Sequence, residues 1–333
     1  MAVLMRGAEA AAGMKEALLA EREALERLCV DPKLARASGK RPTLCFDRQG
    51  GLSVASGAGC ARLRATDTAD RPNAALPLGV RKLGRLAVVR VGAREDDLAY
   101  ERGLMKRFES LGLAVQVVKL PEEINQGDFD AEFERVNSDP TVSGVLLFRP
   151  LPKGLSDEHA RQAIDPRKDV DGMSPVNVAQ VFAGREGFAP CTPSAVMELL
   201  AHYGVSLEGK NVTIIGRSLV VGRPLAMLML AANATVTVCH TRTADLAAAC
   251  RGADILVAAA GRPGTIGADC VTERSIVIDV GINMGRDGKL CGDVDFGAVE
   301  PLVSMITPVP GGVGALTTSV LAKHLLKAAR LQS

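Results

Sequence analysis

The sequence predicts an α/β protein with two domains, on three observations. The chain has 333 residues, which is enough for two hydrophobic cores. Strand-like and helix-like runs alternate in two separate stretches, residues 86–164 and 212–280, an order typical of parallel sheets covered by helices. Segment 210–223 joins a β-branched run to a helix through glycines, as in units that bind phosphate groups.

The first half of the chain contains one set of alternating elements. Apolar residues at helical spacing predict an amphipathic helix over Ala8–Leu28. Residues 165–177 are expected to form a polar turn region, and Thr192 with Pro193 predicts the capped start of a helix that ends at Tyr203. Between these segments we expect strands at Leu86–Val91, Ala114–Val118 and Gly144–Phe148, and helices at Asp97–Leu111, Asp128–Asn137 and Ser156–Ile164.

Residues 29–84 differ in composition from the rest of the chain. Gly, Ser, Ala, Arg and Pro dominate this segment, and its basic residues outnumber its acidic ones. We expect a short hairpin, with strands at Thr43–Phe46 and Leu52–Val54, within a long insertion. A loop of this length usually has a local function or is disordered. Its basic residues could attract a polyanion, but a solvated loop is the simpler interpretation.

The second half of the chain contains a second alternating set, followed by a closing helix. The helix is expected over Thr317–Leu331, with Leu321, Leu325 and Ala328 packing back on the first domain. The alternating set has expected strands at Val212–Ile215, Thr235–Cys239, Asp254–Ala258 and Ile276–Val280, and expected helices at Gly222–Ala232 and Ala244–Cys250.

Composition argues against several classes of function. The net charge of +2 gives no general signal for nucleic acid, and the chain has no Trp and only two Tyr to stack on exposed bases. No apolar run reaches the ~18 residues of a membrane span. Residues 1–13 lack the apolar core of a signal peptide. We therefore expect a cytoplasmic protein with no membrane or nucleic-acid partner.

The cysteine pattern gives no reason to expect a metal site. None of the eight cysteines forms a C-x-x-C pair, and the four histidines lie far apart in the sequence. Cys191 and Cys239 are interpreted as small buried side chains in a reducing compartment.

Segment 210–223 is a candidate phosphate site. Val212–Ile215 is followed by a turn at Gly216 and a helix from Gly222, so free N–H groups and the positive end of a helix dipole can face an anion. The spacing differs from the standard G-x-G-x-x-G pattern. On this segment alone, a glycine needed only for the turn explains the pattern equally well.

Six separated segments together resemble one family, in order and at matching spacing over roughly residues 85–333. It is the bifunctional methylenetetrahydrofolate dehydrogenase/methenyltetrahydrofolate cyclohydrolase family, the FolD proteins. The segments are Lys168-Asp169-Val170-Asp171-Gly172, Pro190-Cys191-Thr192-Pro193, Gly216-Arg217-Ser218 with Val221-Gly222-Arg223-Pro224, Cys239-His240-Thr241-Arg242-Thr243, Asp279-Val280-Gly281-Ile282-Asn283, and Pro308-Val309-Pro310-Gly311-Gly312-Val313-Gly314.

The resemblance implies NADP⁺-dependent oxidation of 5,10-methylenetetrahydrofolate, followed by hydrolysis of the methenyl product to 10-formyltetrahydrofolate. It also implies a cleft between the domains and, usually, a homodimer. On this basis residues 1–190 and 308–333 form an N-terminal α/β substrate domain that binds folate and contains the insertion 29–84. Residues 191–307 form a Rossmann-type NADP-binding domain, and the C-terminal helix returns to the first domain.

The resemblance also implies the cofactor contacts. Arg217, with Thr241 and Arg242, would bind an adenosine 2′-phosphate, because a planar guanidinium matches phosphate and stays charged. No acidic residue ends the expected strand Thr235–Cys239, where Asp or Glu would favour NAD. NADP is therefore preferred, although some relatives with similar residues use NAD. The full set is Gly216, Arg217, Ser218, Gly222, Thr241, Arg242, Ile282 and Thr317.

Substrate contacts are implied in the same way. Asp171 would accept hydrogen bonds from the pterin ring, and the alternative is a loop aspartate that caps its own turn. Glycines 311–314 would close over folate, and the alternative is a plain turn before a helix. The substrate-binding set is Tyr100, Phe148, Asp171, Pro310, Gly311, Gly312 and Gly314, and the catalytic set is Tyr100, Asp171 and Lys106.

The sequence departs from the family at three positions. The family signature is Tyr-x-x-x-Lys, but the residue four after Tyr100 is Leu104. Lys106 matches a second family lysine, and it lies about 200° around the helix from position 104. Phe148 replaces the glutamine that supports the missing lysine, and Ala315 replaces a proline.

These departures leave three function classes open. The leading class is a folate dehydrogenase with weak or absent cyclohydrolase activity, unless Arg149, Arg102 or a residue of the insertion replaces the lysine. The second is a diverged NADP-dependent oxidoreductase for another ligand. The third is a non-catalytic paralogue that binds folate or nucleotide.

Overall fold

The computed structural model describes residues 2–30, 44–46, 52–54, 83–285 and 288–332. The chain divides into two compact units, Met1–Arg22 with Gly84–Ser333, and Glu23–Leu83. Helix α1 (Gly7–Val30) confirms the first expected helix. In the smaller unit, β2 (Leu44–Phe46) and β3 (Leu52–Val54) pair antiparallel, which confirms the expected hairpin. Residues 31–43, 47–51 and 55–82 of the predicted insertion lie outside the described residues.

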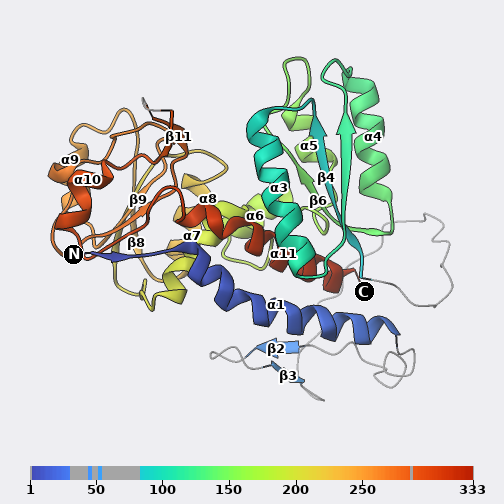
Figure 1. Ribbon diagram of the computed structural model, residues 1–333, viewed down its shortest axis with the longest axis horizontal. Helices are drawn as coiled ribbons and strands as arrows, with labels where there is room; N and C mark the ends of the chain where they lie inside the picture. Colours follow the sequence, from blue (N-terminus) through green and yellow to red (C-terminus); the bar gives the residue numbers. More distant parts are fainter. Residues whose placement is uncertain (1, 31–43, 47–51, 55–82, 286–287, 333) are drawn as a thin grey trace. The chain divides into compact units, whose positions relative to one another are not determined.

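The first sheet of the larger unit has three parallel strands in the order β5-β4-β6. The strands are β4 (Arg85–Val91), β5 (Val115–Leu120) and β6 (Val142–Leu147). Helices α3 (Glu95–Ser110) and α4 (Gln126–Ser138) lie on opposite faces of the sheet, and α5 (Asp157–Ala163) packs beside α4 (Figure 1). All six predicted elements are confirmed, with ends that differ by at most two residues.

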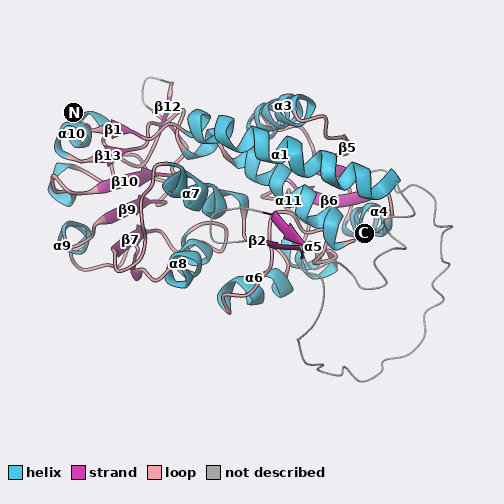
Figure 2. Cartoon of the chain, turned by 90° about the horizontal axis from the view of Figure 1, so that it is seen from below, coloured by secondary structure: helices cyan, strands magenta, loops and turns pink. Residues whose placement is uncertain are grey.

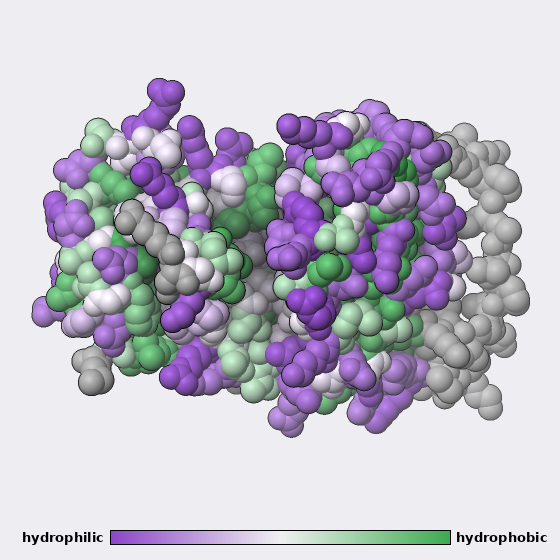
Figure 3. Space-filling model, turned by 45° about the horizontal axis from the view of Figure 1, so that its top comes forward, coloured by the Kyte–Doolittle hydropathy of each residue, from purple (hydrophilic) through white to green (hydrophobic). Residues whose placement is uncertain are grey.

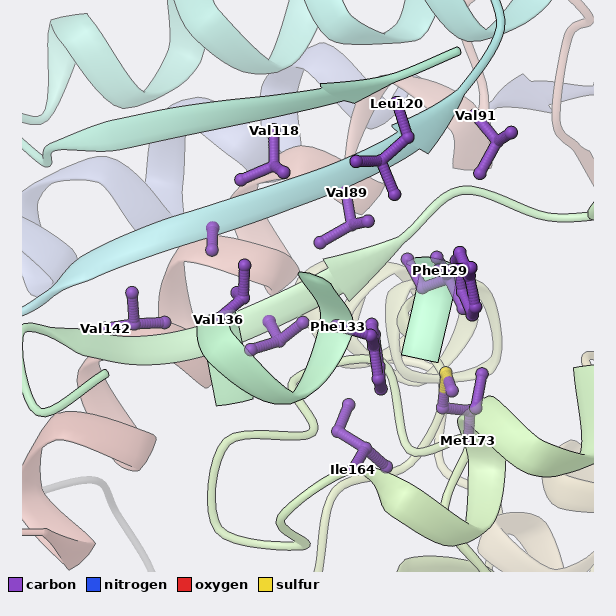
Figure 4. Packing of buried hydrophobic residues seen from close by; sticks show 14 residues of the cluster. Val89, Val91, Val118, Leu120, Phe129, Phe133, Val136, Val142, Ile164 and Met173 are labelled. Carbon is purple, nitrogen blue, oxygen red and sulfur yellow. The ribbon is translucent and has the colours of Figure 1, made fainter. Parts of the chain in front are cut away.

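One face of this sheet holds a compact apolar core. Val89 and Val118, on neighbouring strands, face Phe129 and Phe133 of α4, whose rings stack with centroids 5.7 Å apart (Figure 4). Phe129 is fully buried, and burying a side chain of this size contributes about 1.5–3 kcal/mol. The core therefore fixes the strands whose carboxyl ends lead into the candidate site.

The second sheet has six parallel strands in the order β1-β13-β10-β9-β7-β8 (Figure 2). Its strands are β1 (Val3–Leu4), β7 (Asn211–Ile215), β8 (Thr235–Cys239), β9 (Ile255–Ala258), β10 (Ile276–Asp279) and β13 (Met305–Ile306). The helices that follow these strands include α8 (Gly222–Ala231), α9 (Leu246–Arg251) and the short α10 (Phe296–Val299). A small hairpin of β11 (Asn283–Met284) and β12 (Leu290–Cys291) completes this lobe, with 3₁₀ turns η1 (Ala268–Cys270) and η2 (Glu300–Leu302). A third 3₁₀ turn, η3 (Val313–Ala315), contacts α7 (Cys191–His202) and α11 (Thr317–Leu331).

The structure differs from the sequence prediction in three places. Helix α6 (Pro175–Phe182) begins within the expected turn region, because the Ser174 hydroxyl caps it. Helix α7 (Cys191–His202) starts one residue earlier than expected, and its Pro190 cap makes no side-chain hydrogen bond, so the predicted Thr192 cap is wrong. Strand β1 pairs with β13 and so belongs to the second sheet, whereas residues 1–190 were all assigned to the first domain.

The C-terminal helix α11 (Thr317–Leu331) returns to the first sheet as predicted. It packs against β6, α3 and α7, and Leu321, Leu325 and Ala328 are fully buried. Gly144 on β6 allows this approach, since a Cβ there would lie 3.0 Å from Leu325 and 2.6 Å from Val170. Within the described part of the chain, no helix is both long and apolar enough to cross a membrane.

Candidate active site

The segment 168–172 is held against the edge of the first sheet. The Val145 N–H donates to the carbonyl of Lys168 at 2.7 Å, and Asp169 forms a parallel bridge with Val145. Asp169 is fully buried, so its role is structural, and no role was expected for it from the sequence. Its carboxylate accepts hydrogen bonds from the Met173 N–H (2.9 Å), the Ser174 N–H (2.8 Å) and the Asn177 side-chain amide (2.8 Å).

Asp171 extends from this anchored segment toward α7. Its Oδ1 accepts a hydrogen bond from the Cys191 N–H at 3.0 Å, and its Oδ2 lies 3.6 Å from Nη2 of Arg149. Burial raises the pKa of Asp171, while the Cys191 N–H and the Arg149 guanidinium oppose that rise. Because its backbone donor lies twenty residues along the chain, Asp171 does not cap its own turn. The side chain keeps 21% exposure, so part of the carboxylate stays open to a ligand.

The turn after Asp171 requires glycine. Gly172 has a φ of +61°, and a Cβ there would lie 2.2 Å from the carbonyl oxygen of Phe188. Any larger residue would push the segment that leads into α7 away from Asp171.

Tyr100 faces the same region from helix α3. An ion pair between Arg90 and Glu101, at 2.9 Å, ties this part of the helix to β4. The Tyr100 phenol is close to the side chains of Asp171 and Thr317, and burial raises its pKa, so it is a neutral hydrogen-bonding group at pH 7.

The residues around Tyr100 are apolar where the family signature has polar groups. The Phe148 ring meets the Tyr100 ring edge-on, with centroids 5.8 Å apart. Leu104 is fully buried one turn further along α3. Lys106 is exposed and lines a cavity that also reaches Tyr100, on a different side of the helix from Leu104. The structure therefore does not bring the Lys106 amine to the position that Leu104 occupies.

The glycine-rich loop 308–314 packs on the start of α1. The Gly7 N–H donates to the Gly311 carbonyl at 3.0 Å, and a Cβ on Gly7 would lie 2.0 Å from the Gly312 oxygen. Pro310, Gly311 and Gly314 are exposed, and Gly312 is buried. The Thr317 hydroxyl donates to the Gly314 carbonyl at 3.1 Å. The structure thus places Thr317, predicted as a cofactor contact, between Tyr100 and this loop.

The turn after β7 is built as a close-packed glycine pair. Gly216 has a φ of +132°, and a Cβ there would lie 2.1 Å from the Ala259 carbonyl oxygen. A Cβ on Gly222, at the start of α8, would lie 2.0 Å from the Gly216 oxygen. The Ser218 hydroxyl accepts from the Val221 N–H at 3.0 Å. Both positions therefore require glycine, because another part of the backbone lies against each of them. The absence of side chains also leaves room for a phosphate at the start of α8.

Two arginines lie at the carboxyl ends of neighbouring strands. Arg217 follows β7, and Thr241 and Arg242 follow β8, whose last residue Cys239 pairs in register with Ile215. All three side chains are exposed, and neither arginine forms an ion pair with any carboxylate in the described ranges. Since β8 ends without an acid, this corner fits the 2′-phosphate of NADP.

Two buried aspartates hold the remaining loops of this lobe together. Asp293 accepts from the N–H groups of Ala260 (2.6 Å), Gly261 (2.9 Å) and Arg262 (2.8 Å) and from the Asn283 amide (2.8 Å). Asp279 accepts from the N–H groups of Gly281 (2.9 Å), Asp293 (3.0 Å) and Val294 (2.9 Å). Between these anchors Ile282 is 70% exposed, as a residue that contacts a bound nicotinamide would be.

His324 of α11 contacts the backbone of the segment that carries Asp171. Its Nδ1 lies 2.8 Å from the carbonyl oxygen of Val170 and 3.9 Å from the Cys191 sulfur. Burial, with Lys327 and Lys323 nearby, lowers the pKa of His324 to about 4. The ring is therefore neutral at pH 7, and its Nδ1–H donates to Val170.

Acidification from pH 6.5 to pH 4 is expected to cost this protein up to about 3 kcal/mol of folding stability through His324. In this window His324 is protonated in the unfolded chain and neutral in the native protein, so the free energy of unfolding falls as pH falls. Urea unfolding at several pH values between 4 and 6.5 measures this free energy. The His324→Gln variant should lose this part of the pH dependence, and an unchanged slope would contradict the assignment.

An anchored carboxylate beside a buried tyrosine and a dinucleotide-type turn together define a two-domain α/β dehydrogenase. Figure 3 shows the surface hollowed between the lobes of the two sheets, within the larger unit. Residues 65–171 match the family model of the tetrahydrofolate dehydrogenase/cyclohydrolase catalytic domain, and residues 190–333 match that of its NAD(P)-binding domain. The chain belongs to this family, the FolD proteins.

Individual relatives agree with that assignment. The chain is 52% identical to the "Bifunctional protein FolD" of Clostridioides difficile over 250 residues, 75% of this chain and 87% of the relative. The FolD crystal structure from Campylobacter jejuni aligns over 100% of both chains, with a TM-score of 0.81 and 34% identity. A Trypanosoma brucei FolD structure, complexed with NADP cofactor and inhibitor, aligns over 99% of this chain and 98% of its own, with a TM-score of 0.77 and 31% identity.

Proposed function

We propose that this protein oxidises 5,10-methylenetetrahydrofolate to 5,10-methenyltetrahydrofolate with NADP⁺, in one-carbon folate metabolism. The observation that carries the proposal is Asp171, an anchored carboxylate with an open side, next to the buried phenol of Tyr100. A pterin presents an amino group and a ring N–H side by side, and two neighbouring donors match the two oxygens of one carboxylate.

The chain's residues bind, orient and exclude water. Asp171 holds the pterin, and the apolar side chains of Leu104 and Phe148 keep water from the face beside Tyr100. The folate nitrogens can expel hydride from the bridging carbon and leave a stabilised cation, so the step needs neither a metal nor a strong protein base. When bound, NADP⁺ supplies the hydride acceptor. The protein therefore contributes by holding the substrate in position and by excluding water from it.

The cofactor is held by the turn after β7 and the corner after β8. Gly216, Ser218 and Gly222 leave space and N–H groups for the diphosphate. Arg217, with Thr241 and Arg242, binds the 2′-phosphate.

The Arg217→Gln substitution is expected to raise KM for NADP⁺ by a factor of about 10–150, from the loss of a charged hydrogen bond worth about 1.5–3 kcal/mol. Initial rates with NAD⁺, which lacks the 2′-phosphate, are the matched control and should change less than about threefold. If the substitution affects the reactions with NADP⁺ and NAD⁺ equally, Arg217 does not bind the 2′-phosphate.

We further propose that hydrolysis of the methenyl product is weak. Leu104 and Phe148 are buried hydrocarbon next to Tyr100, and neither can manage the proton of an attacking water. Arg149 is the cation paired with Asp171, but a guanidinium has only N–H donors and no acceptor atom, so it cannot take a proton from water.

An absorbance assay and a thermal-melting assay together separate the possible functions. Purified protein with methylenetetrahydrofolate and NADP⁺ should form NADPH and methenyltetrahydrofolate together, and the methenyl absorbance should then decay at the buffer rate. Decay well above that rate would overturn the proposal for Leu104. A melting shift with NADP⁺ alone would favour a different oxidoreductase, and shifts with both ligands but no turnover would favour a non-catalytic paralogue.

Two further features of the assembly are proposed. Strand β8 is an edge of the second sheet, and Val238 on it and Leu230 on α8 are 38% and 55% exposed, so we infer a homodimer that covers this edge. Light scattering on the purified chain tests the proposed homodimer.

The buried free thiols of Cys191, Cys239 and Cys250 favour a reducing compartment, which supports a cytoplasmic location.

A further inference from the structure

A second feature of the candidate site is the side chain of Arg149, a mostly buried cation beside Asp171. This side chain keeps 19% exposure; its Nη2 lies 3.6 Å from Oδ2 of Asp171, and its Nη1 lies 3.8 Å from Oδ1 of Asp157. Both separations are longer than a hydrogen bond. The residues that the structure describes provide no acceptor that is hydrogen-bonded to this guanidinium. Its N–H groups can therefore donate to a ligand.

The backbone that carries Arg149 is anchored on both sides of the residue. The Phe148 N–H donates to a carbonyl of β4 at 2.9 Å. The Arg94 guanidinium donates to the carbonyls of Arg149 and Pro150, each at 3.4 Å. Asp97 holds the Arg94 guanidinium in turn, through hydrogen bonds of 2.8 and 3.0 Å. Because this backbone is anchored, the Arg149 side chain stays within reach of the same carboxylate.

The Asp171 carboxylate is oriented with one oxygen toward Arg149. Oδ1 accepts from the Cys191 N–H at 3.0 Å, and Oδ2 is the oxygen next to the guanidinium. A pterin presents an amino group, a ring N–H and an oxo group in a row on one edge. When the two donors of this edge bind Asp171 with the ring N–H on Oδ2, the oxo group follows on the side of Arg149.

The oxo group needs a donor, and the side chains beside Tyr100 do not supply one. Leu104 and Phe148 are buried hydrocarbon. An acceptor that is buried without a donor costs about 1–3 kcal/mol. Arg149 is the cation paired with Asp171, and it carries donors that have no acceptor of their own.

We propose that the Arg149 side chain donates to the oxo group of the pterin, so that Asp171 and Arg149 together select a donor-donor-acceptor edge. The inference rests on the proposed function, because Asp171 must bind the two donors of the pterin. In a 4-amino pteridine an amino group replaces the oxo group, and the adjacent ring nitrogen has no hydrogen. Asp171 then loses one donor, and the Arg149 guanidinium faces another donor. The pair therefore favours 4-oxo over 4-amino pteridines.

The test compares the Kd values of the full-length protein for tetrahydrofolate and for its 4-amino analogue, measured by calorimetry. The wild type should bind tetrahydrofolate more tightly. Arg149→Met should reduce the ratio of the two Kd values by a factor of about 10–150, from the loss of one hydrogen bond with a charged donor. Because an oxo group needs only one donor, Arg149→Lys should restore part of the ratio, and a ratio as low as that of Arg149→Met would contradict the contact.

The pH dependence separates a direct contact from an effect on Asp171. The reduction in Arg149→Met should be the same at about pH 6 and at about pH 8, a range in which a carboxyl with a raised pKa would change its ionisation. Besides Arg149, the charged or titratable groups near this carboxyl are Asp169, Cys191 and Tyr100. A reduction confined to the lower pH would mean that Arg149 acts only by keeping Asp171 ionised, and the proposed contact would fail.

Arg135→Met is the matched control, because Arg135 is an exposed arginine of α4 whose guanidinium is already paired with Glu132 at 2.8 Å. It should leave the ratio of Kd values unchanged. An unchanged ratio in Arg149→Met, or equal reductions in the two variants, would overturn the role of Arg149 even if the protein forms NADPH. If the ratio changes as expected and no NADPH forms from methylenetetrahydrofolate, the pterin contact stands and the proposed dehydrogenase fails.

Discussion

The Asp171→Asn substitution is expected to lower kcat/KM for methylenetetrahydrofolate by a factor of roughly 30–5,000. An asparagine can keep the 3.0 Å bond from the Cys191 N–H through its carbonyl oxygen. Its amide then points a donor at the two donors of the pterin, and the Arg149 guanidinium loses the nearer and more buried of its two carboxylate partners. Removing one partner of a buried charge-assisted contact costs about 2–5 kcal/mol, which is the quoted range.

Two controls make this result specific. Asp157, whose side chain is 46% exposed, lies 3.8 Å from the same arginine, and Asp157→Asn should change kcat/KM less than about threefold. The Kd for NADP⁺ should stay the same in both variants, since Arg217, Thr241 and Arg242 follow strands of the other sheet. A kcat/KM within threefold of the wild type in Asp171→Asn would place the pterin elsewhere.

The order of elements could be predicted because each strand and helix carries its own local pattern. The strand Thr235–Cys239 and the helix Thr317–Leu331 were predicted to the residue, from β-branched runs and from apolar residues at helical spacing. Strand β1 could not be predicted, because two residues carry no periodic pattern and its pairing with β13 spans about 300 positions. Helix α6 was missed because its Ser174 cap and Pro175 also read as turn residues.

The sequence predicted the site residues that are placed to contact a ligand. It did not predict the residues that hold the site together through contacts within the protein. Asp171 and Arg217 were identified from motifs that contain them. Asp293 and His324 were not, because each contacts groups that are distant in sequence. Asp169 was not either, because its local contacts with residues 173–177 become structural only through its burial. One signal was available for Asp293. Glycines such as Gly281, where a Cβ would lie 2.4 Å from the Asp293 carboxylate, stand next to the buried acids in these loops.

The Asp293→Ala substitution is expected to lower the free energy of unfolding by about 3–5 kcal/mol. The carboxylate is fully buried and is the acceptor for three consecutive backbone N–H groups, those of residues 260–262, and for the Asn283 amide. Alanine leaves these donors without a partner in a space that the native acid fills. Each unsatisfied buried donor costs about 1–3 kcal/mol, and partial access of water to the loop reduces the sum.

Urea unfolding followed by circular dichroism measures the loss, and Asp295→Ala is the matched control. Asp295 is only two residues away, but it accepts one N–H, that of Ala298 at 3.3 Å, as an exposed helix cap, so its loss should cost about 0.5–2 kcal/mol. Because Asp293 also fixes the loops on both sides of Ile282, the Ala variant should bind NADP⁺ more weakly at temperatures where it is still folded. Equal midpoints for Asp293→Ala and Asp295→Ala would show that the loops hold their shape without the buried carboxylate, and Ile282 would then need another explanation for its position.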